Sequence, residues 1–585
     1  MRTLAHVTHE AVHKIGGIGT VLEGLLTARA YHEAVDRTVL VGPLFSVEGD
    51  ATTRLGRGGE VFYSSIDHRR DHPAAHALRD VEQRCGVSII YGRRPFKAVD
   101  TGFESAPEVL LIAVWHAHPG PLKYLKFRLY ESFGIASDRY ESIWEYEQYV
   151  RLAMPALEAL RAIGACGGAE QQCVVVAHEF MGMPTALAAK LFPEFGCKAV
   201  FQAHEVAAVR KIVEEHPCHD TMFYNVLRRA PREGLYLEDV FGSQDGYFKH
   251  PLVKAARYCD NILAVGDDVV EELRFLSPRF KDAPISLTYN GIPAYRSTAD
   301  EDTASKRRLQ VYAENLLGFC PDFVFTHVTR LVRSKGLWRD LEVMEHIERA
   351  FRADGRTAVL FVLSTEMGGP RRPADILRME RDYGWPVAHR EGLPDLSGGE
   401  AAYYVGVQAF NARSRQCKVI FLNQFGFDRE HCGLRMPEDV RFWDIRRGSD
   451  LEFGQSVYEP FGIAQIEALS FGSICVMSTV CGCAGFVRRV TDNRPGPNVI
   501  AVDYTHLDQP VAQVRDLLKL TEADRVRIER NVAREAARQI LAALPTTPIQ
   551  SAALLDRGHE IARRMSWDVI ARDYFMPAIE YAIKR

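Results

Sequence analysis

Short apolar runs alternate with longer amphipathic segments along most of the chain. Each apolar run ends in small, polar or charged residues, and apolar positions with helical spacing follow in segments such as 183–192 and 337–351. Continuously apolar strands that alternate with helices are typical of parallel sheets covered on both faces. We therefore predict strands at 37–43, 108–114, 172–179, 197–205, 260–266, 322–330, 357–364, 417–423 and 473–479.

The alternating pattern is interrupted once, by a polar and charged stretch near 292–320. With 585 residues the chain is too long for one ordinary hydrophobic core. We predict an α/β protein of two Rossmann-like domains that face a central cleft, residues 1–300 and residues 315–563. In such sheets ligands bind beyond the carboxyl ends of the strands, so the residues that follow each apolar run are the candidates for chemistry.

Two further segments stand apart from the strand–helix pattern. Residues 365–455 are longer and less regular than one strand–helix unit requires, which favours an insertion that serves acceptor binding or oligomer contacts. Residues 564–585 have the spacing of an amphipathic terminal helix.

Bulk properties exclude several classes of partner. The formal net charge of −4 gives no reason to expect a nucleic acid or an anionic membrane. We find no apolar stretch of about 18 residues and no leader-like apolar segment near the start. The 12 cysteines are thinly spread, as in a reduced, cytoplasmic protein.

The first motif is HKIGGIGTVLEGL at 13–25. Lys14, Gly16, Gly17 and Gly19 precede an apolar run with helical spacing. Glycines let a backbone approach a ligand closely, and a helix N-terminus has free N–H groups that suit a phosphate. A plain glycine turn between a strand and a helix explains the pattern equally well.

The second motif is VTRLVRSKGLWRD at 328–340, which places Arg330, Arg333 and Lys335 in a loop after a strand. Cations clustered at the carboxyl end of a strand suit a diphosphate. A solvated basic loop is the alternative interpretation.

The third motif is YEPFGIAQIEALSFG at 458–472. Pro460 favours a helix start and Gly462 allows a tight loop before it, so we predict Glu459 on the loop and Glu467 further along a helix. A carboxylate accepts hydrogen bonds from two adjacent hydroxyls, so this pair suits a sugar and a ribose. The alternative is two surface glutamates.

Histidines supply two weaker signals. His178-Glu179 and His204-Glu205 each follow an apolar strand, where an imidazole can bond to a sugar hydroxyl, although a lone histidine is usually structural. The cluster EEHPCHD at 214–220 has too tight a spacing for one tetrahedral zinc, so we predict no metal site.

Taken together, the order Lys-x-Gly-Gly, His-Glu, Arg-x4-Lys-Gly and Glu-Pro-x-Gly-x4-Glu resembles the retaining GT-B glycosyltransferases, and within them the glycogen and starch synthases. The opening VTHEAVHKIGGIGTVLEGL and the segments FQAHEVAAVRK, FYNVL and YNGIP resemble the animal and fungal glycogen synthases in particular. The resemblance extends over much of the chain.

The resemblance implies a nucleotide-sugar donor, a glucan or sugar acceptor, and no cofactor or metal, because cations and amides can stabilise the leaving diphosphate. Donor binding then falls to Lys14, Gly16, Gly17, Arg330, Lys335, Glu459, Phe461, Gly462 and Glu467. The catalytic residues would be Glu459, His178, Arg330 and Lys335. It also implies that residues 1–300 form the acceptor-side domain and residues 315–563 the nucleotide-sugar-binding domain. The helix around Trp567 would then return to the first domain, near Asn290 and Gly291.

Several points stay open at this stage. The loop CGCAG at 481–485 stands where many relatives have two glycines, and bacterial synthases often have His-Asp in place of His178-Glu179. The donor, ADP-glucose or UDP-glucose, is therefore undecided. A homo-oligomer is possible. The rival functions are a transferase for a small sugar acceptor, another sugar-nucleotide chemistry such as epimerisation, and a catalytically inactive glucan-binding homologue.

Overall fold

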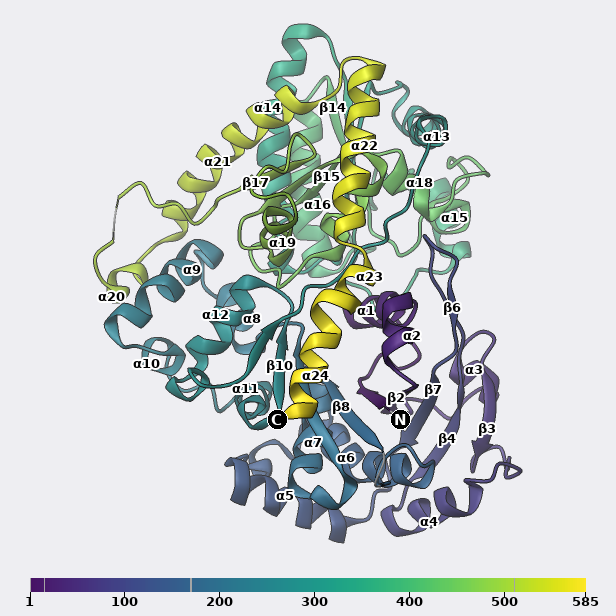
Figure 1. Cartoon of the computed structure of the whole chain (residues 1–585). Helices are drawn as coiled ribbons and strands as arrows, with labels where there is room; N and C mark the ends of the chain where they lie inside the picture. Colours follow the sequence, from purple (N-terminus) through teal and green to yellow (C-terminus); the bar gives the residue numbers. More distant parts are fainter. Residues whose placement is uncertain (1, 15, 169–170, 510) are drawn as a thin grey trace. The chain divides into compact units, whose positions relative to one another are not determined.

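The chain folds into two compact units (Figure 1). The computed structural model describes residues 2–14, 16–168, 171–509 and 511–585. The first unit consists of Met1–Val209, Ala230–Gly291 and Trp567–Arg585. The second consists of Arg210–Arg229 and Ile292–Ser566.

The first unit is built on a mostly parallel sheet of order β11-β10-β9-β8-β1-β2-β7-β4-β3. Strand β4 runs antiparallel to both of its neighbours and forms the irregular edge with β3. The strands are β1 (Arg2–Val7), β2 (Arg37–Pro43), β3 (Glu60–Ser64), β4 (Ser88–Arg93), β7 (Glu108–Ala113), β8 (Gln172–His178), β9 (Cys197–Ala203), β10 (Asn261–Ala264) and β11 (Ile285–Leu287), with a separate pair β5 (Phe96–Lys97) and β6 (Glu104–Ser105).

Helices cover this sheet, and the longest of them follow or precede the central strands. Helix α7, after β8, is buried along almost its whole length, which its run of small and apolar residues permits. The helices are α1 (Gly17–Leu26), α2 (Arg29–Ala34), α3 (Ala51–Leu55), α4 (Ala75–Cys85), α5 (Pro119–Phe133), α6 (Trp144–Ala162), α7 (Glu179–Leu191), α8 (Ala207–Glu215, which crosses the division), α10 (Leu237–Phe241), α11 (Lys249–Lys254) and α12 (Asp267–Leu276).

The last residues of the chain return to the first unit. Helix α23 (Trp567–Ile570), a π turn (Ala571–Phe575) and helix α24 (Met576–Lys584) form one helical run, and α24 lies beside β10 in Figure 1. The Asn261 side-chain amide donates to the Ala578 carbonyl at 2.9 Å. A Cβ atom on Gly291 would lie 2.7 Å from the Trp567 ring, so this glycine is required for the helix to dock.

The second unit is built on a fully parallel sheet of order β14-β13-β12-β15-β16-β17. In β12, Phe323 and Phe325 belong to one buried cluster and Val324 to another. The two clusters lie on opposite faces of the sheet, which is why its strands are continuously apolar. The strands are β12 (Phe323–Val328), β13 (Ala358–Leu363), β14 (Cys417–Leu422), β15 (Leu451–Gly454), β16 (Ile474–Ser478) and β17 (Val499–Val502).

The helices of the second unit are α9 (His219–Arg229), α13 (Ala299–Leu317), α14 (Trp338–Asp354), α15 (Pro373–Tyr383), α16 (Gly398–Arg413), α17 (Arg429–Cys432), α18 (Phe442–Arg447), α19 (Gly482–Val490), α20 (Val514–Leu517), α21 (Glu522–Ala543) and α22 (Pro548–Arg564). Residues 365–455, which the sequence assigns to a region with an insertion, contain the sheet strands β14 and β15 as well as four helices.

All the strands predicted from apolar runs are present, each within a few residues of its expected bounds. The division of the chain differs from the sequence-based boundaries in two respects. The second unit begins at Ile292 and not at residue 315, so helix α13 belongs to it. Residues 210–229 belong to the second unit, because the buried Arg339 of α14 donates to both Asp220 carboxylate oxygens, at 2.7 and 3.0 Å. Thr221 and Asn225 of α9 also donate to the backbone carbonyls of Tyr504 and Thr505.

Two further findings concern membrane-spanning helices and disulfide bonds. Among the residues that the structure describes, no helix has the length and apolar character needed to cross a bilayer. The structure describes all twelve cysteines, and each is free.

Candidate functional site

In the second unit, the loops that follow β12 and β15 are joined through their backbones. The amides of Val457 and Tyr458 donate to the Ser334 carbonyl at 2.8 and 3.2 Å. Both loops lie at the carboxyl ends of neighbouring parallel strands, where an open α/β sheet binds its ligands. This connection brings the second and third sequence motifs together.

Lys335 and Glu459 are the side chains that meet across these loops. The Lys335 Nζ atom forms an ion pair with Glu459 Oε2, and each side chain is less than one-fifth exposed. Gln465 Nε2 also approaches Glu459 Oε2, at 3.5 Å. Arg330 lies in the same loop as Lys335 and is exposed to solvent. A cation, a carboxylate and a nearby exposed guanidinium form a site that can hold both a phosphate and a hydroxyl-bearing ligand.

Glycines allow this geometry at two positions. Gly336 has φ +62°, and a Cβ atom there would lie 2.7 Å from the Gln455 carbonyl oxygen of the adjoining loop. Gly462 has φ +93°, and a Cβ atom there would lie 2.6 Å from Gln465 Oε1. Both backbones lie in the left-handed region, which disfavours a side chain. A side chain at Gly336 would press on the backbone of the adjoining loop, and one at Gly462 would press on the Gln465 side chain.

The loop CGCAG begins helix α19, and its first amides are already bonded. Gly482 and Cys483 donate to the carbonyls of Glu459 and Phe461, at 3.1 and 2.8 Å. A Cβ atom on Gly482 would overlap the Pro460 carbonyl. Phe461 is 2 % exposed and its ring packs near Phe486. Its backbone carbonyl is the group that accepts the hydrogen bond from this loop.

Glu467 is held by an arginine that the sequence reading did not single out. Arg446 Nη2 lies 3.3 Å from Glu467 Oε2, and its Nη1 lies 2.7 Å from Glu452 Oε1. Arg446 is itself buried. No single helix carries Glu467: two short 3₁₀ turns, Ile463–Gln465 and Glu467–Phe471, replace the predicted one because Ile466 (φ −128°) interrupts it.

In the first unit, the Glu10 carboxylate lies at the start of helix α1. Glu10 Oε2 accepts hydrogen bonds from the amides of Gly16 and Gly19, each at 2.9 Å. A Cβ atom on Gly19 would lie 2.8 Å from this oxygen, which explains the glycine. Two of the amides at this helix start, those of Gly16 and Gly19, are thus bonded to Glu10 and not to a phosphate. Lys14 pairs with Glu23 and is half exposed, and a Cβ atom on Gly17 would meet open space.

His178, predicted to lie beside the transferred sugar, is fully buried at the end of β8. Its Nε2 atom lies 2.9 Å from His6 Nδ1, and its Nδ1 atom lies 2.9 Å from His204 Nε2. Burial and the neighbouring histidines lower the pKa of His178 well below its usual value. Both ring nitrogens are therefore bonded within the protein, and His204, half-buried at the end of β9, is the outermost of the three rings.

Glu179, the residue after His178, has an unusual environment. It is 4 % exposed, and its backbone is in the left-handed region at φ +59°, a strained conformation for a side chain of this size. The Glu205 amide donates to Glu179 Oε1 at 2.7 Å, while Oε2 is buried with no bonded partner among the described residues. Burial, reinforced by the Glu205 carboxylate, raises the pKa of Glu179 well above its usual value.

The EEHPCHD cluster has structural contacts. Asp220 binds Arg339, Cys218 Sγ donates to the Thr521 carbonyl at 2.8 Å, and His219 Nδ1 bonds the Val213 carbonyl at 2.7 Å. Over the described ranges, no three His, Cys, Asp or Glu side chains are grouped so that they could hold a metal ion.

Comparison with solved structures identifies the fold. The catalytic domain of starch synthase IV from Arabidopsis thaliana, bound to ADP and acarbose, is 14% identical, with 100% of this chain and 99% of that chain covered and a TM-score of 0.55. The UDP-forming α,α-trehalose-phosphate synthase of Burkholderia xenovorans, in complex with glucose-6-phosphate, is 11% identical, with 99% and 100% covered and a TM-score of 0.51.

A third structure with this fold is the N-terminal domain of trehalose-6-phosphate phosphatase from Candida albicans, at 12% identity, 99% and 97% coverage and a TM-score of 0.52. No protein-family model matches the chain, and neither does any curated protein. The chain thus has the α/β fold of the GT-B glycosyltransferases, as the sequence resemblance predicted. Proteins with different names share this fold, so the chemistry has to be argued from the site.

Proposed function

We propose that the chain is a retaining glycosyltransferase that moves glucose from a nucleoside-diphosphate-glucose to the non-reducing end of an α-1,4-glucan. The observation that carries the proposal is the pairing of Lys335 with Glu459 at the carboxyl ends of β12 and β15. The similarity of fold to the catalytic domain of a starch synthase, which was solved with ADP and acarbose, supports a nucleotide-linked donor and a glucan acceptor.

In this proposal the second unit binds the donor. Arg330 and Lys335 stabilise the diphosphate as it leaves, and the departing phosphate oxygen takes the proton of the attacking hydroxyl. Glu459 accepts hydrogen bonds from the sugar hydroxyls, and Glu467, held by Arg446, accepts those of the ribose. The donor phosphate replaces Glu459 as the partner of Lys335, which releases the carboxylate for the sugar. The mechanism requires no metal ion.

The first unit is proposed to serve the acceptor side. Glu10 already bonds the amides of Gly16 and Gly19. We therefore assign the contact with the sugar or phosphate to the Lys14 ammonium and to the Gly17 backbone, beside which there is open space. His204 is proposed as the imidazole nearest the reacting sugar, with His178 behind it.

The decisive measurement is nucleoside-diphosphate release by the purified full-length protein, without added metal, from ADP-glucose and from UDP-glucose. Each donor is tested with glycogen, with glucose-6-phosphate and without acceptor, and Glu459→Ala is the inactive reference. Glycogen-dependent release that Glu459→Ala abolishes would support the proposal and identify the donor.

A small phosphorylated sugar is the second candidate acceptor, because the similar Burkholderia xenovorans enzyme was solved with glucose-6-phosphate. Release with glucose-6-phosphate but not with glycogen would favour that function. If neither acceptor gives release, but glycogen still binds in a pull-down, the chain is an inactive glucan-binding homologue.

Replacing the cation of the site gives a sharper test. We expect Lys335→Ala to lower turnover by about 10²- to 10³-fold, as the loss of one preorganised charge donor to the leaving group does. Lys519→Ala, which removes an exposed lysine paired with Asp516 in the same unit, is the matched control and should retain turnover. Equal turnover in the two variants would contradict the role of Lys335.

A further inference from the structure

A continuous chain of hydrogen bonds crosses the sheet of the first unit. Thr38 Oγ1 lies 2.9 Å from the Tyr31 hydroxyl, which lies 3.1 Å from His6 Nε2. His6 Nδ1 and His178 Nε2 are 2.9 Å apart, as are His178 Nδ1 and His204 Nε2. We call this chain of five side chains the histidine relay.

The relay follows the order of the strands. Thr38 is on β2, His6 on β1, His178 on β8 and His204 directly after β9, and these strands are consecutive neighbours in the sheet. Tyr31 of α2 spans the step from β2 to β1. The three imidazoles are packed as a row, with ring centroids 5.2 Å apart at each step. Such alignment on rigid strands gives the relay a fixed geometry.

The three rings are neutral at ordinary pH. Burial lowers the pKa of His6 and of His204 to about 3, and that of His178 well below its usual value. A neutral imidazole has one N–H donor and one acceptor nitrogen. Each ring in a row must therefore donate on one side and accept on the other, and all three must point the same way.

When Tyr31 donates within the relay, two arrangements satisfy every bond. In the first, Tyr31 donates to His6, His6 donates to His178, His178 donates to His204, and His204 has its proton on Nδ1. In the second every bond is reversed: His204 has its proton on Nε2, its Nδ1 is an acceptor, and Tyr31 donates to Thr38. Conversion takes up one proton at Thr38 and releases one at His204, so no side chain changes its charge.

We propose that Thr38 and Tyr31 are positioning residues for His204. Through His6 and His178 they determine whether His204 Nδ1 donates or accepts a hydrogen bond. This nitrogen is the end of the relay that has no bonded partner within the described residues. A sugar hydroxyl could meet it in either role. Only the contact between His204 Nδ1 and a sugar hydroxyl rests on the proposed function, and the control of the tautomer does not depend on it.

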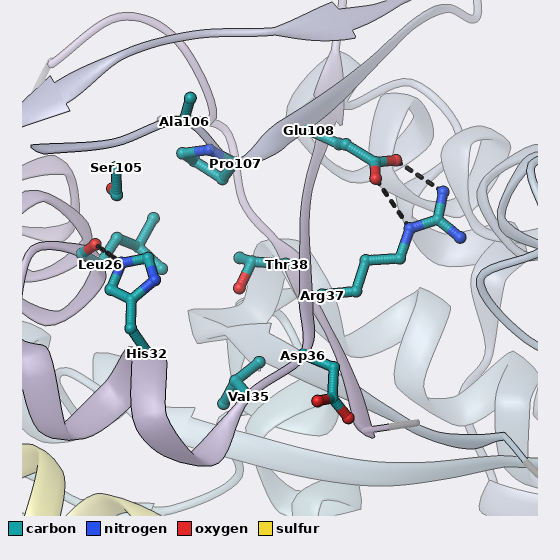
Figure 2. Close-up of a pocket in the computed structure, with 10 residues that line it drawn as sticks. All are labelled: Leu26, His32, Val35, Asp36, Arg37, Thr38, Ser105, Ala106, Pro107 and Glu108. Carbon is teal, nitrogen blue, oxygen red and sulfur yellow. Dashed lines mark hydrogen bonds and ion pairs between the residues drawn. The ribbon is translucent and has the colours of Figure 1, made fainter.

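The other end of the relay lies in a cavity of about 250 Å³ (Figure 2). Thr38 lines this cavity with Arg37 and Glu108, which form an ion pair at 2.7 Å. Because Thr38 borders this cavity, a different side chain at this position does not have to fit into a closed core. His32 lines the same cavity but bonds the Leu26 carbonyl at 2.7 Å, outside the relay.

Two substitutions at Thr38 should drive the relay in opposite directions. Thr38→Val removes the hydroxyl, so Tyr31 has only His6 as its partner and donates to it, which places the His204 proton on Nδ1. Thr38→Asp supplies a strong acceptor, so Tyr31 donates to it and accepts from His6, which places the His204 proton on Nε2. Thr38→Asn, with an uncharged acceptor oxygen, is the second variant if Thr38→Asp fails to fold.

The measurement is the ¹⁵N spectrum of full-length protein labelled at histidine, because the two neutral tautomers have distinct ring-nitrogen shifts. His204 is assigned by the signal lost in His204→Gln. We expect the Nδ1–H to Nε2–H ratio at His204 to be higher in Thr38→Val than in the acceptor variant, by about two- to tenfold per net hydrogen bond. His32→Gln should match the unsubstituted protein.

The same His204 ratio in Thr38→Val and in the folded acceptor variant would overturn the inference. The spectra do not depend on catalysis, so they decide the relay even if no glycosyl transfer is found. If transfer is found, the two variants should differ in kcat while KM for the nucleotide-sugar changes little, since no residue of the relay is assigned to the nucleotide or the diphosphate. A common loss of kcat with identical tautomers would indicate a merely structural effect.

Discussion

At the scale of single residues, charged side chains at both candidate sites are bonded to other groups of the protein. Glu459 pairs with Lys335, Glu467 with Arg446, and Glu10 with two backbone amides. Glu459 and Glu467 lie in one of the motifs identified from the sequence, and Glu10 lies just before another. The sequence predicted the residue types, but not that they neutralise one another, since partners such as Arg446 are remote or unremarkable in sequence.

Glu179 allows a test of its burial through the pH dependence of stability. Its pKa is raised in the folded state, whereas in the unfolded chain it ionises near its usual value of 4.5. Unfolding therefore releases a proton above that pH, so the folded state loses stability as pH rises towards the raised pKa. Relative to Glu179→Gln, which cannot ionise, the protein should lose up to about 1.4 kcal/mol per pH unit.

The measurement is the free energy of unfolding in urea for both proteins at pH 5 and pH 8. Glu33→Gln, at an exposed site in the same unit, controls for the general effect of removing a carboxylate. A difference between the protein and Glu179→Gln that is the same at both pH values would show that Glu179 ionises normally in the folded state.

At the scale of elements, the loops at the ends of the parallel strands depend on glycines with positive φ. The positions of β12 and β13 followed from apolar runs, because a strand buried on both faces must be apolar throughout. The sheet strands β1, β3, β4, β11, β15 and β17 were not predicted, and neither was the separate pair β5 and β6. β15 has a buried glutamate, Glu452, at its second position, paired with Arg446, so its pattern does not read as a buried strand.

We expect Gly336→Ala to destabilise the second unit by about 1–3 kcal/mol, because alanine at φ +62° is strained and its Cβ would press on the Gln455 carbonyl. Gly355→Ala is the matched control. It has φ +77° at the end of α14, but its Cβ would meet open space, so only the backbone strain remains, about 1 kcal/mol. The midpoints of chemical unfolding measure both, and a smaller cost at Gly336 than at Gly355 would refute the close packing of the two loops.

At the scale of the whole molecule, the chain passes between its units after Val209, Arg229, Gly291 and Ser566. The last two crossings are tied together within each unit: Gly291 packs against Trp567, and the Ile292 amide donates to the Met565 carbonyl at 3.0 Å. The motif YNGIP and the tryptophan of the final helix are therefore structural partners. The sequence resemblance implied that both lie near the crossover.

Arg339 holds residues 210–229 to the second unit, and its removal should release them. Arg339→Ala leaves the buried Asp220 and Glu529 without their shared partner, which we expect to cost about 3–5 kcal/mol. Amide hydrogen exchange should then speed up in α9 and the start of α21, more than in α24 of the first unit. Arg349→Ala, which breaks an exposed pair with Glu345 on the same helix, should leave exchange in α9 unchanged.

The sequence by itself determined the class of fold, the positions of most central strands and the motifs that bear on function. It did so because burial on both faces of a parallel sheet and the turns at its edge each demand particular residue types at adjacent positions. The tertiary structure decided what those residues contact. The burial of His178 between His6 and His204, the carboxylate at the start of α1 and the transfer of α9 to the second unit all depend on residues tens to hundreds of positions apart, whose proximity no local pattern records.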